Sequence, residues 1–416
     1  MSKTTIISKS PVSWRRNLLA IWFAELVAII GFTFVIPLLP LYVQELGVQG
    51  EQEVRIWSGV VFSAHAVTMA IFGPIWGALS DRYGRKVMVE RAMSAGAILI
   101  TLMGFAQSVE QLALLRALQG ALTGTVTAAN VLVATTAPRK RVGYALGMLQ
   151  MAIYAGASAG PLLGGLVADS FGYRAAFWVT GALLFLAALG VLIFVKEKFR
   201  PVAPPVSEQA SADAGGMTLR RRVWNRLSPV LGSPPLLGVL GVRFLMRLGG
   251  RLLGPVLPLF IQEIAPAGAR VASISGLVGG VGAAAGALGA LGLGRLGDRR
   301  GYRGILVACA MGSAVCYLSQ FFVGDPGWLL FLQAGAGLAM GGILASISAL
   351  LASLAPEGRE GIVYGVDASV VSVANAIGPM TGSALAVWLG LREPFLFAAI
   401  IFVLAGVAAA RLLPRR

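Results

Sequence analysis

The sequence carries one motif twice, once in each half of the chain. The first copy comprises Gly77, Leu79, Asp81, Arg82 and Gly84, and its members return 217 residues later as Gly294, Leu296, Asp298, Arg299 and Gly301. A glycine pattern that begins at Gly143 likewise returns 218 residues later, at Gly361. Repetition at a fixed offset indicates similar structural units. We therefore expect two homologous domains, residues 1–195 and 234–416, joined by a cytoplasmic linker over residues 196–233.

Composition places both domains in a membrane. Of the 416 residues, 57% are hydrophobic and 12% are charged, whereas a soluble domain carries about 25% charged residues. Apolar stretches of about 20 residues, enough to cross the hydrocarbon core of a bilayer, occur near 17–44, 56–79, 87–107, 110–135, 142–168, 175–195, 235–262, 272–293, 303–323, 327–354, 361–389 and 394–412. Helices satisfy their own backbone hydrogen bonds in lipid. The sequence therefore predicts an all-α membrane protein with twelve transmembrane helices in two six-helix bundles related by a pseudo-twofold axis.

The distribution of charge explains the net charge of +16 without a nucleic-acid partner. We assign 26 of the 34 Lys and Arg residues to the termini, the even-numbered loops and the adjoining ends of the spans. Cytoplasmic loops of membrane proteins carry such an excess of Lys and Arg. This pattern predicts that both termini are cytoplasmic and that the chain is a multi-pass protein of the cytoplasmic (inner) membrane.

The repeated motif lies between the second and third spans and combines glycines with opposite charges. Gly84 permits a short turn with costly backbone angles, and Gly77 permits close helix contact. The segment Gly77–Lys86 resembles the cytoplasmic motif of the major facilitator superfamily. In that family the acid, here Asp81, meets the N-terminus of the eleventh helix near Gly361, where the helix dipole favours an anion. The resemblance implies a latch that closes the cytoplasmic side, formed by Gly77, Asp81, Arg82, Gly84 and Arg85, with a second copy at Asp298, Arg299 and Gly301 that meets the fifth helix near Gly143.

The fifth span carries a second motif, a stripe of small residues. It comprises Gly147, Gly156, Gly160, Pro161, Gly164 and Gly165. Such a stripe lets another helix approach without side chains between the two. It resembles the antiporter motif of the same superfamily, which implies that the fifth helix faces the eighth helix across the two halves. The eighth span has its own glycine stripe, Gly276, Gly279, Gly282, Gly286 and Gly289.

The fourth span contains a charged residue within apolar sequence. Arg116, followed by Gln119 and Gly120, is costly in lipid and requires a partner or water. Its repeat counterpart is Gln333, so a span of this type does not need the charge in order to fold. The segment resembles the proton-coupling motif of the twelve-span drug:H⁺ antiporter family, and the whole chain resembles the MdtG-like multidrug-resistance group of that family. A structural salt bridge is the alternative role for Arg116.

Glu25 lies about 12 Å inside the first span. A buried carboxyl can load and release a proton as its access to water alternates. Related multidrug transporters carry an acid at this place, which implies a proton-coupling role. The alternative is an acid neutralised by a neighbouring arginine.

The seventh span carries Arg243, Arg247 and Arg251 at intervals of four residues, which places them on one helix face. Unpaired, they would be costly in the membrane. Arg243 is the repeat counterpart of Glu25, and Asp367 in the eleventh span is the other candidate partner and a third proton-coupling candidate. Three interpretations remain open: a salt-bridge network that changes during transport, an anion-binding stripe, and static structure.

Further polar residues within spans are candidates for the substrate cavity; they are Gln119, Asn130, Gln150, Gln333 and Asn375. No metal-ligand cluster, nucleophilic triad or ATP-binding loop is evident, so we predict no enzyme, no cofactor and no metal. We expect a monomeric secondary transporter that exports small amphipathic compounds in exchange for protons. One alternative is export of an organic anion recognised by the arginines of the seventh span. Another is a membrane receptor or scaffold that does not transport.

Overall fold

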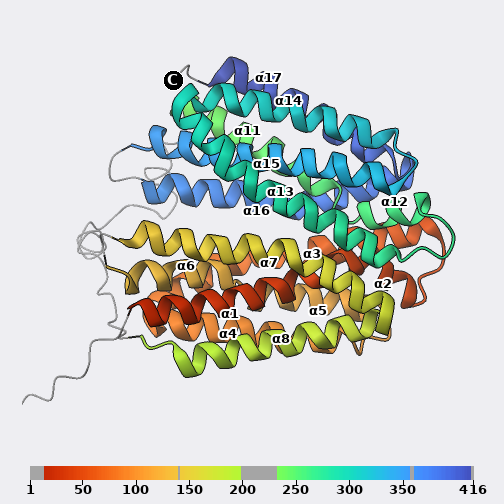
Figure 1. Ribbon diagram of the computed structural model, residues 1–416, viewed down its shortest axis with the longest axis horizontal. Helices are drawn as coiled ribbons and strands as arrows, with labels where there is room; N and C mark the ends of the chain where they lie inside the picture. Colours follow the sequence, from red (N-terminus) through yellow and green to blue (C-terminus); the bar gives the residue numbers. More distant parts are fainter. Residues whose placement is uncertain (1–13, 139–140, 198–231, 357–359, 414–416) are drawn as a thin grey trace, which may run out of the picture.

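A computed structural model describes residues 14–138, 141–197, 232–356 and 360–413. The described residues form helices arranged in two bundles, one from each half of the chain (Figure 1). The predicted linker, 196–233, lies almost wholly outside these residues.

The first bundle contains the helices that the first six predicted spans require. They are α1 (Trp14–Phe34), η1 (Ile36–Leu38), α2 (Leu39–Glu45), α3 (Glu51–Tyr83), α4 (Arg85–Met103), α5 (Val109–Leu122), α6 (Thr125–Thr136), α7 (Val142–Phe171) and α8 (Tyr173–Phe194). The first predicted span is thus α1, η1 and α2 in succession. The fourth, predicted as one helix over 110–135, is divided into α5 and α6, because Gly124 has a φ of +132° that ends the helical path.

The second bundle repeats this arrangement. It contains α11 (Pro234–Leu252), α12 (Leu257–Ile264), α13 (Val271–Arg300), α14 (Tyr302–Phe321), α15 (Pro326–Leu354), α16 (Glu360–Trp388) and α17 (Glu393–Leu412). Among the described residues, ten helical segments are long and apolar enough to cross a membrane. The other two predicted spans are α4, whose first turns are charged, and the divided pair α5 and α6.

Buried aromatic side chains confirm that the two bundles share one fold. In the first bundle the rings of Tyr42 and Phe177 lie 4.7 Å apart. In the second, the rings of Phe260 and Phe395 lie 4.9 Å apart, and these residues are the repeat counterparts of the first pair. All four side chains are fully buried. The same pair therefore fixes α2 on α8 and α12 on α17.

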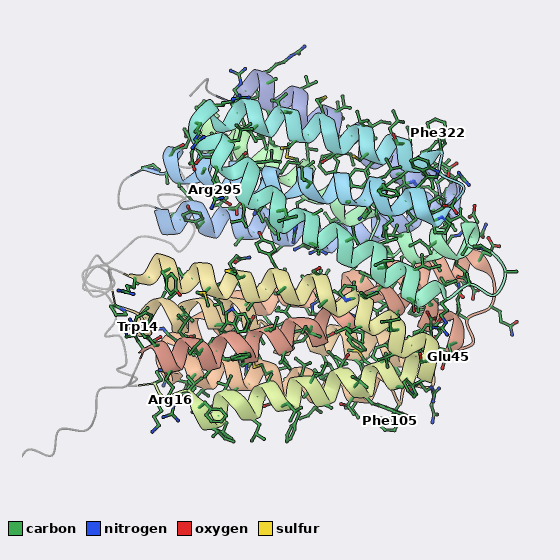
Figure 2. All side chains as sticks on the ribbon, in the orientation of Figure 1. Trp14, Arg16, Glu45, Phe105, Arg295 and Phe322 are labelled. Carbon is green, nitrogen blue, oxygen red and sulfur yellow. The ribbon has the colours of Figure 1, made fainter. Side chains whose placement is uncertain are left out.

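The two bundles meet at one end of the molecule. We call the end at which α1 begins and α17 ends the terminal end, and the opposite end, with the turns after α2 and α12, the loop end (Figure 1). The labelled Arg16 and Arg295 lie toward the terminal end, and Glu45 lies at the loop end (Figure 2). Helix α7 contacts α13 and helix α3 contacts α16 in the half of the molecule nearer the loop end, as the residues below show.

Candidate transport pathway

The arginines of the seventh predicted span lie on α11 and face α16. Arg243 Nε lies 3.2 Å from Asp367 Oδ1, and both side chains are largely buried. One and two turns further along α11, Arg247 and Arg251 each donate a hydrogen bond from Nε to the same atom, Asn375 Oδ1, at 2.9 Å. The helix spacing of four residues thus produces a ladder of three cations against one acid and one amide.

This ladder decides between the two candidate partners of Arg243. The structure pairs it with Asp367 and not with Glu25. The ladder also retains excess positive charge, since one carboxylate faces three guanidinium groups. Arg251 is exposed. Its Cβ nevertheless lies close to α16, since a Cβ added at Gly378 would lie 2.6 Å from the Cβ of Arg251.

Glu25 is fully buried on α1. Neither carboxylate oxygen has a hydrogen-bond partner among the described residues. The side chain therefore occupies an environment in which a charge would be very costly. Trp22, three residues earlier in the same helix, also has a buried ring nitrogen without a hydrogen-bond partner among the described residues.

Arg116 is buried on α5 and is held by neutral groups. Its Nη1 donates to Gln119 Oε1 at 2.6 Å, and its Nε donates to the backbone oxygen of Val61 at 3.4 Å. Among the described residues no acid forms an ion pair with it. Its repeat counterpart, Gln333, accepts a hydrogen bond from Gln320 at 3.2 Å. The predicted coupling candidates Glu25, Arg116 and Asp367 therefore lie on three different helices and form no hydrogen bond or ion pair with one another in this conformation.

The glycine stripe of α7 faces two helices, which the spacing alone did not indicate. A Cβ at Gly156, Gly160 or Gly164 would collide with residues 26–34 of α1, inside the first bundle. A Cβ at Gly165 would lie 2.2 Å from the backbone oxygen of Ala272 on α13, across the two bundles. The expected approach of the fifth and eighth helices is present, but three of the five glycines of the stripe face α1.

The glycines of α13 are divided in the same way. Gly276 and Gly280 face α7, where a Cβ at Gly276 would lie 2.0 Å from the backbone oxygen of Pro161. Ser158 also donates a hydrogen bond to the backbone oxygen of Gly280 at 3.1 Å. Gly282, Gly286 and Gly289 instead face α15. The expected approach of the eighth helix to the fifth is present at Gly276, while the spacings of three and four residues turn the later glycines of the stripe away from α7 and toward α15.

The repeated charged motif lies at the terminal end. Gly84 and Gly301 have φ angles of 101° and 90° and connect α3 to α4 and α13 to α14. Asp298 accepts a hydrogen bond from the Tyr302 hydroxyl. Added Cβ atoms at Gly77, Gly143 and Gly361 would have no neighbour within 4 Å. The side chain of Asp81 lies outside the described residues, so the predicted contact between Asp81 and Gly361 stays a prediction.

Glu197 anchors this motif. Its carboxylate oxygens accept hydrogen bonds from the backbone nitrogens of Arg85 at 3.2 Å and Lys86 at 2.8 Å. A carboxylate at the first turn of α4 is stabilised by the helix dipole. The motif residues Arg82 and Arg299 are exposed. Among the described residues, Asn130 on α6 and Gln150 on α7 form no hydrogen bond to another helix, so their predicted role in substrate binding stays a prediction.

At the loop end, three contacts join the bundles. The side chains of Gln44 and Gln262 exchange two hydrogen bonds, of 2.9 and 3.1 Å. Arg55 Nη1 donates to the backbone oxygen of Ala386 at 2.8 Å, and Asp169 Oδ2 accepts from the backbone nitrogen of Ser273 at 2.7 Å. Nothing in the sequence predicted that these residues join the bundles. The one available signal was that Gln44 and Gln262 are repeat counterparts.

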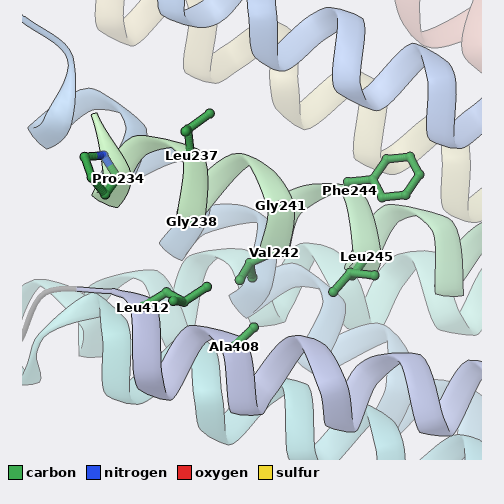
Figure 3. Close-up of a pocket in the computed structure, with 9 residues that line it drawn as sticks. All are labelled: Pro234, Leu237, Gly238, Gly241, Val242, Phe244, Leu245, Ala408 and Leu412. Atoms are coloured by element: carbon green, nitrogen blue, oxygen red, sulfur yellow. The ribbon is translucent and has the colours of Figure 1, made fainter. Parts of the chain in front are cut away.

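Two apolar grooves lie away from the arginine ladder. One, of about 550 Å³, runs between α11 and α17 and is lined by residues such as Leu237, Gly241 and Leu412 (Figure 3). The other, of about 520 Å³, lies between α1 and α8. Their linings are repeat counterparts; for example, Leu19 corresponds to Leu237. Both contain apolar side chains almost throughout, as a lipid-facing surface does.

Two repeated bundles of membrane-length helices, with a ladder of arginines between α11 and α16, define a multi-pass membrane transport protein. The model of the Major Facilitator Superfamily matches residues 21–246 and 239–416. The chain belongs to this superfamily, and its substrates are therefore small molecules.

Curated relatives and solved structures agree with this assignment. The chain is 36% identical to "Multidrug resistance protein MdtG" of Enterobacter lignolyticus, covering 96% of this chain and 93% of the relative. It is 35% identical to the MdtG protein of an Escherichia coli strain, covering 98% and 97%. A bacterial homologue of the human lysosomal transporter Spinster, in an inward-facing and unoccupied conformation, superposes with a TM-score of 0.75 at 17% identity, covering 96% and 97%. The human organic anion transporter MFSD10 gives 0.68 at 19% identity, covering 95% and 99%. The predicted superfamily, fold and MdtG-like resemblance are confirmed.

Proposed function

We propose that the protein exports small amphipathic compounds in exchange for protons, by tilting its two bundles so that a shared cavity opens to one face of the membrane and then the other. Its sequence is similar over almost its whole length to proteins named for multidrug resistance, which supports this substrate class. Two homologous bundles support the tilting mechanism, since binding sites of such transporters lie between the repeats. We further propose a monomer in the cytoplasmic membrane with both termini in the cytoplasm.

The orientation follows from charge. Basic residues gather at the terminal end, and positive charge concentrates in cytoplasmic loops. The terminal end is then cytoplasmic, and the loop end, where the bundles contact each other, faces outward. The structure is accordingly an inward-facing conformation under this proposal.

The proposed proton coupling depends on the buried carboxyl of Glu25. Its buried carboxyl has no hydrogen-bond partner, so in this conformation it is best occupied by a proton. The proton leaves when water from the cytoplasmic side reaches the Glu25 carboxyl, which is still fully buried in this structure, and the carboxylate takes up a new proton from the outside after the bundles tilt. Arg116 and Asp367 would respond to this change in charge through rearranged hydrogen bonds.

The energetics permit this coupling. A proton that moves through a potential of 100 mV releases about 2.3 kcal/mol. A tenfold solute gradient costs about 1.4 kcal/mol. One proton per substrate therefore sustains a gradient of about fortyfold.

Transport in proteoliposomes tests the proposal. With an imposed pH gradient, addition of a lipophilic cation such as ethidium should drive proton release, and Glu25→Gln should abolish this release while the protein still folds. Glu53→Gln, which removes an exposed carboxylate from the first turn of α3 and lies outside every proposed site, should retain a pH-dependent flux. A flux through the wild type that does not depend on the pH gradient would refute proton coupling. The absence of any flux would favour a receptor or scaffold.

The arginine ladder supports a second candidate, export of an organic anion. Three guanidinium groups face one carboxylate, and Asn375 neutralises none of their charge. Such an excess of cations attracts anions in a site of low dielectric constant. Replacing ethidium with an organic anion such as a bile acid separates the two: the ladder predicts that anion transport falls strongly in Arg247→Gln, while ethidium transport does not.

A further inference from the structure

At the loop end, two contacts between the bundles each join a charged side chain to the end of a helix. On one seam, the carboxylate of Asp169 on α7 accepts a hydrogen bond from Ser273 N, in the first turn of α13. The first backbone N–H groups of a helix have no partner within it, and the helix dipole favours a negative charge there. The α7–α13 seam is therefore closed by an anion at a helix N-terminus.

The opposite seam uses the reverse arrangement. Arg55 on α3 donates to the backbone oxygen of Ala386, in the last turn of α16. The last carbonyl groups of a helix lack partners, and the dipole there favours a positive charge. Glu51, one turn before Arg55, binds the same guanidinium at 2.7 Å and orients it. The α3–α16 seam is therefore closed by a cation at a helix C-terminus.

Between the seams, Gln44 and Gln262 form the reciprocal amide pair described above. We propose that these three contacts form a latch at the loop end that sets the inward-facing conformation as the resting state of the transporter. We call them the loop-end latch: Gln44 with Gln262, Arg55 with Ala386, and Asp169 with Ser273. The inference rests on the proposed alternating mechanism for its role in transport.

The chemistry of the loop-end latch suits a reversible contact. None of its three contacts joins two opposite formal charges across the bundles. When the bundles separate, Arg55 keeps its partner Glu51, and Asp169 enters water at the membrane surface, so no charge is left buried and unpaired. The formal ion pairs at this end instead lie within one bundle each: Arg174 with Glu45, and Arg392 with Glu263. Those pairs can persist while the latch opens.

The test measures the conformational equilibrium and not transport. Spin labels at Gln52→Cys and Ala267→Cys, both exposed at the loop end on different bundles, report the separation of the bundles in lipid nanodiscs. Cys309 and Cys316 are first replaced by serine. In Asp169→Ala, and in Arg55→Met, the ratio of long to short distances should rise about tenfold, which corresponds to about 1.4 kcal/mol. The combination of the two should raise it further.

Matched controls remove a charge from the same end without touching the latch. Arg174→Met and Arg392→Met each break an ion pair within one bundle and should leave the distance distribution unchanged. Where Asp169→Ala does not fold, Gln44→Leu supplies a second variant, because this side chain is only partly buried and removing its amide breaks both hydrogen bonds. It should raise the ratio severalfold.

A wild-type distribution in the latch variants would overturn the proposal, as would an equal shift in the controls. These outcomes do not depend on flux. If the latch variants shift the spin-label distances but the wild type shows no proton-coupled transport, the loop-end latch is supported and the proposed function is refuted. If the wild type shows proton-coupled transport but the latch variants leave the distances unchanged, the loop-end latch is refuted and the proposed function stands.

Discussion

Gly164 and Gly165 are adjacent in α7, yet a side chain added at each should have a different effect on the protein. A Cβ at Gly165 would lie 2.2 Å from the backbone oxygen of Ala272 and 2.6 Å from the Cα of Ser273, both on α13 of the other bundle. A Cβ at Gly164 would lie 2.1 Å from the backbone oxygen of Phe34, in the same bundle. Backbone atoms cannot turn aside as a flexible side chain can, so in both variants a helix must move.

The two alanine variants should therefore fail differently. Overpacking of this kind costs about 1–3 kcal/mol. In Gly165→Ala that cost applies only while α7 and α13 are in contact, so the ratio of separated to closed bundles at the loop end should rise by about 5- to 150-fold, and the melting temperature should fall less than in Gly164→Ala. In Gly164→Ala the same cost applies in either conformation, so the melting temperature should fall while the conformational ratio stays as in the wild type.

The assay pairs two readouts on the same samples. Spin-label distances between Gln52→Cys and Ala267→Cys give the ratio, and thermal unfolding in detergent gives the melting temperature. Equal distance distributions in the two variants would refute the assignment of Gly165 to the seam between bundles. A fall in melting temperature for Gly165→Ala as large as for Gly164→Ala would refute it as well.

Three further predictions concern single contacts. Asn375→Leu removes the acceptor shared by Arg247 and Arg251 and should lower the affinity for an organic anion about tenfold or more, measured by equilibrium binding, because the freed guanidinium groups lose their orientation. Glu197→Gln weakens two hydrogen bonds at the start of α4 and should reduce stability by about 1 kcal/mol in thermal unfolding, whereas a substitution at Glu53, an exposed residue of α3, should not. Gly84→Ala should cost about 1–2 kcal/mol, because its φ of 101° disfavours a side chain, while Gly77→Ala, which has open space and an ordinary helical backbone, should be neutral.

The repeat was enough to predict the fold. Once the offset of 218 residues is known, the packing of Tyr42 on Phe177 requires that of Phe260 on Phe395, and the structure shows both. The partner of Arg243 was also accessible, because few acids occur within the spans and Asp367 was one of two candidates. Scarcity of acids in the membrane made that contact predictable.

Other features depended on information that spacing does not contain. A run of glycines defines a face of a helix but not the neighbour it meets, and so Gly160 was expected to face the second bundle and instead faces α1. The division of the fourth span at Gly124 could not be predicted from the sequence, because apolar residues continue on both sides of this glycine. Arg55 and Asp169 lie near the ends of spans, where charged residues are ordinary, so nothing in their sequence context marked a contact across the bundles.

Gln44 and Gln262 occupy equivalent positions in the two repeats and bind each other, so the pair lies on the pseudo-twofold axis itself. A contact on a symmetry axis cannot be loosened from one side: rotation of either bundle strains both hydrogen bonds equally. The amide pair therefore responds in the same way to a movement of either bundle, and both of its hydrogen bonds break together when the loop-end latch opens.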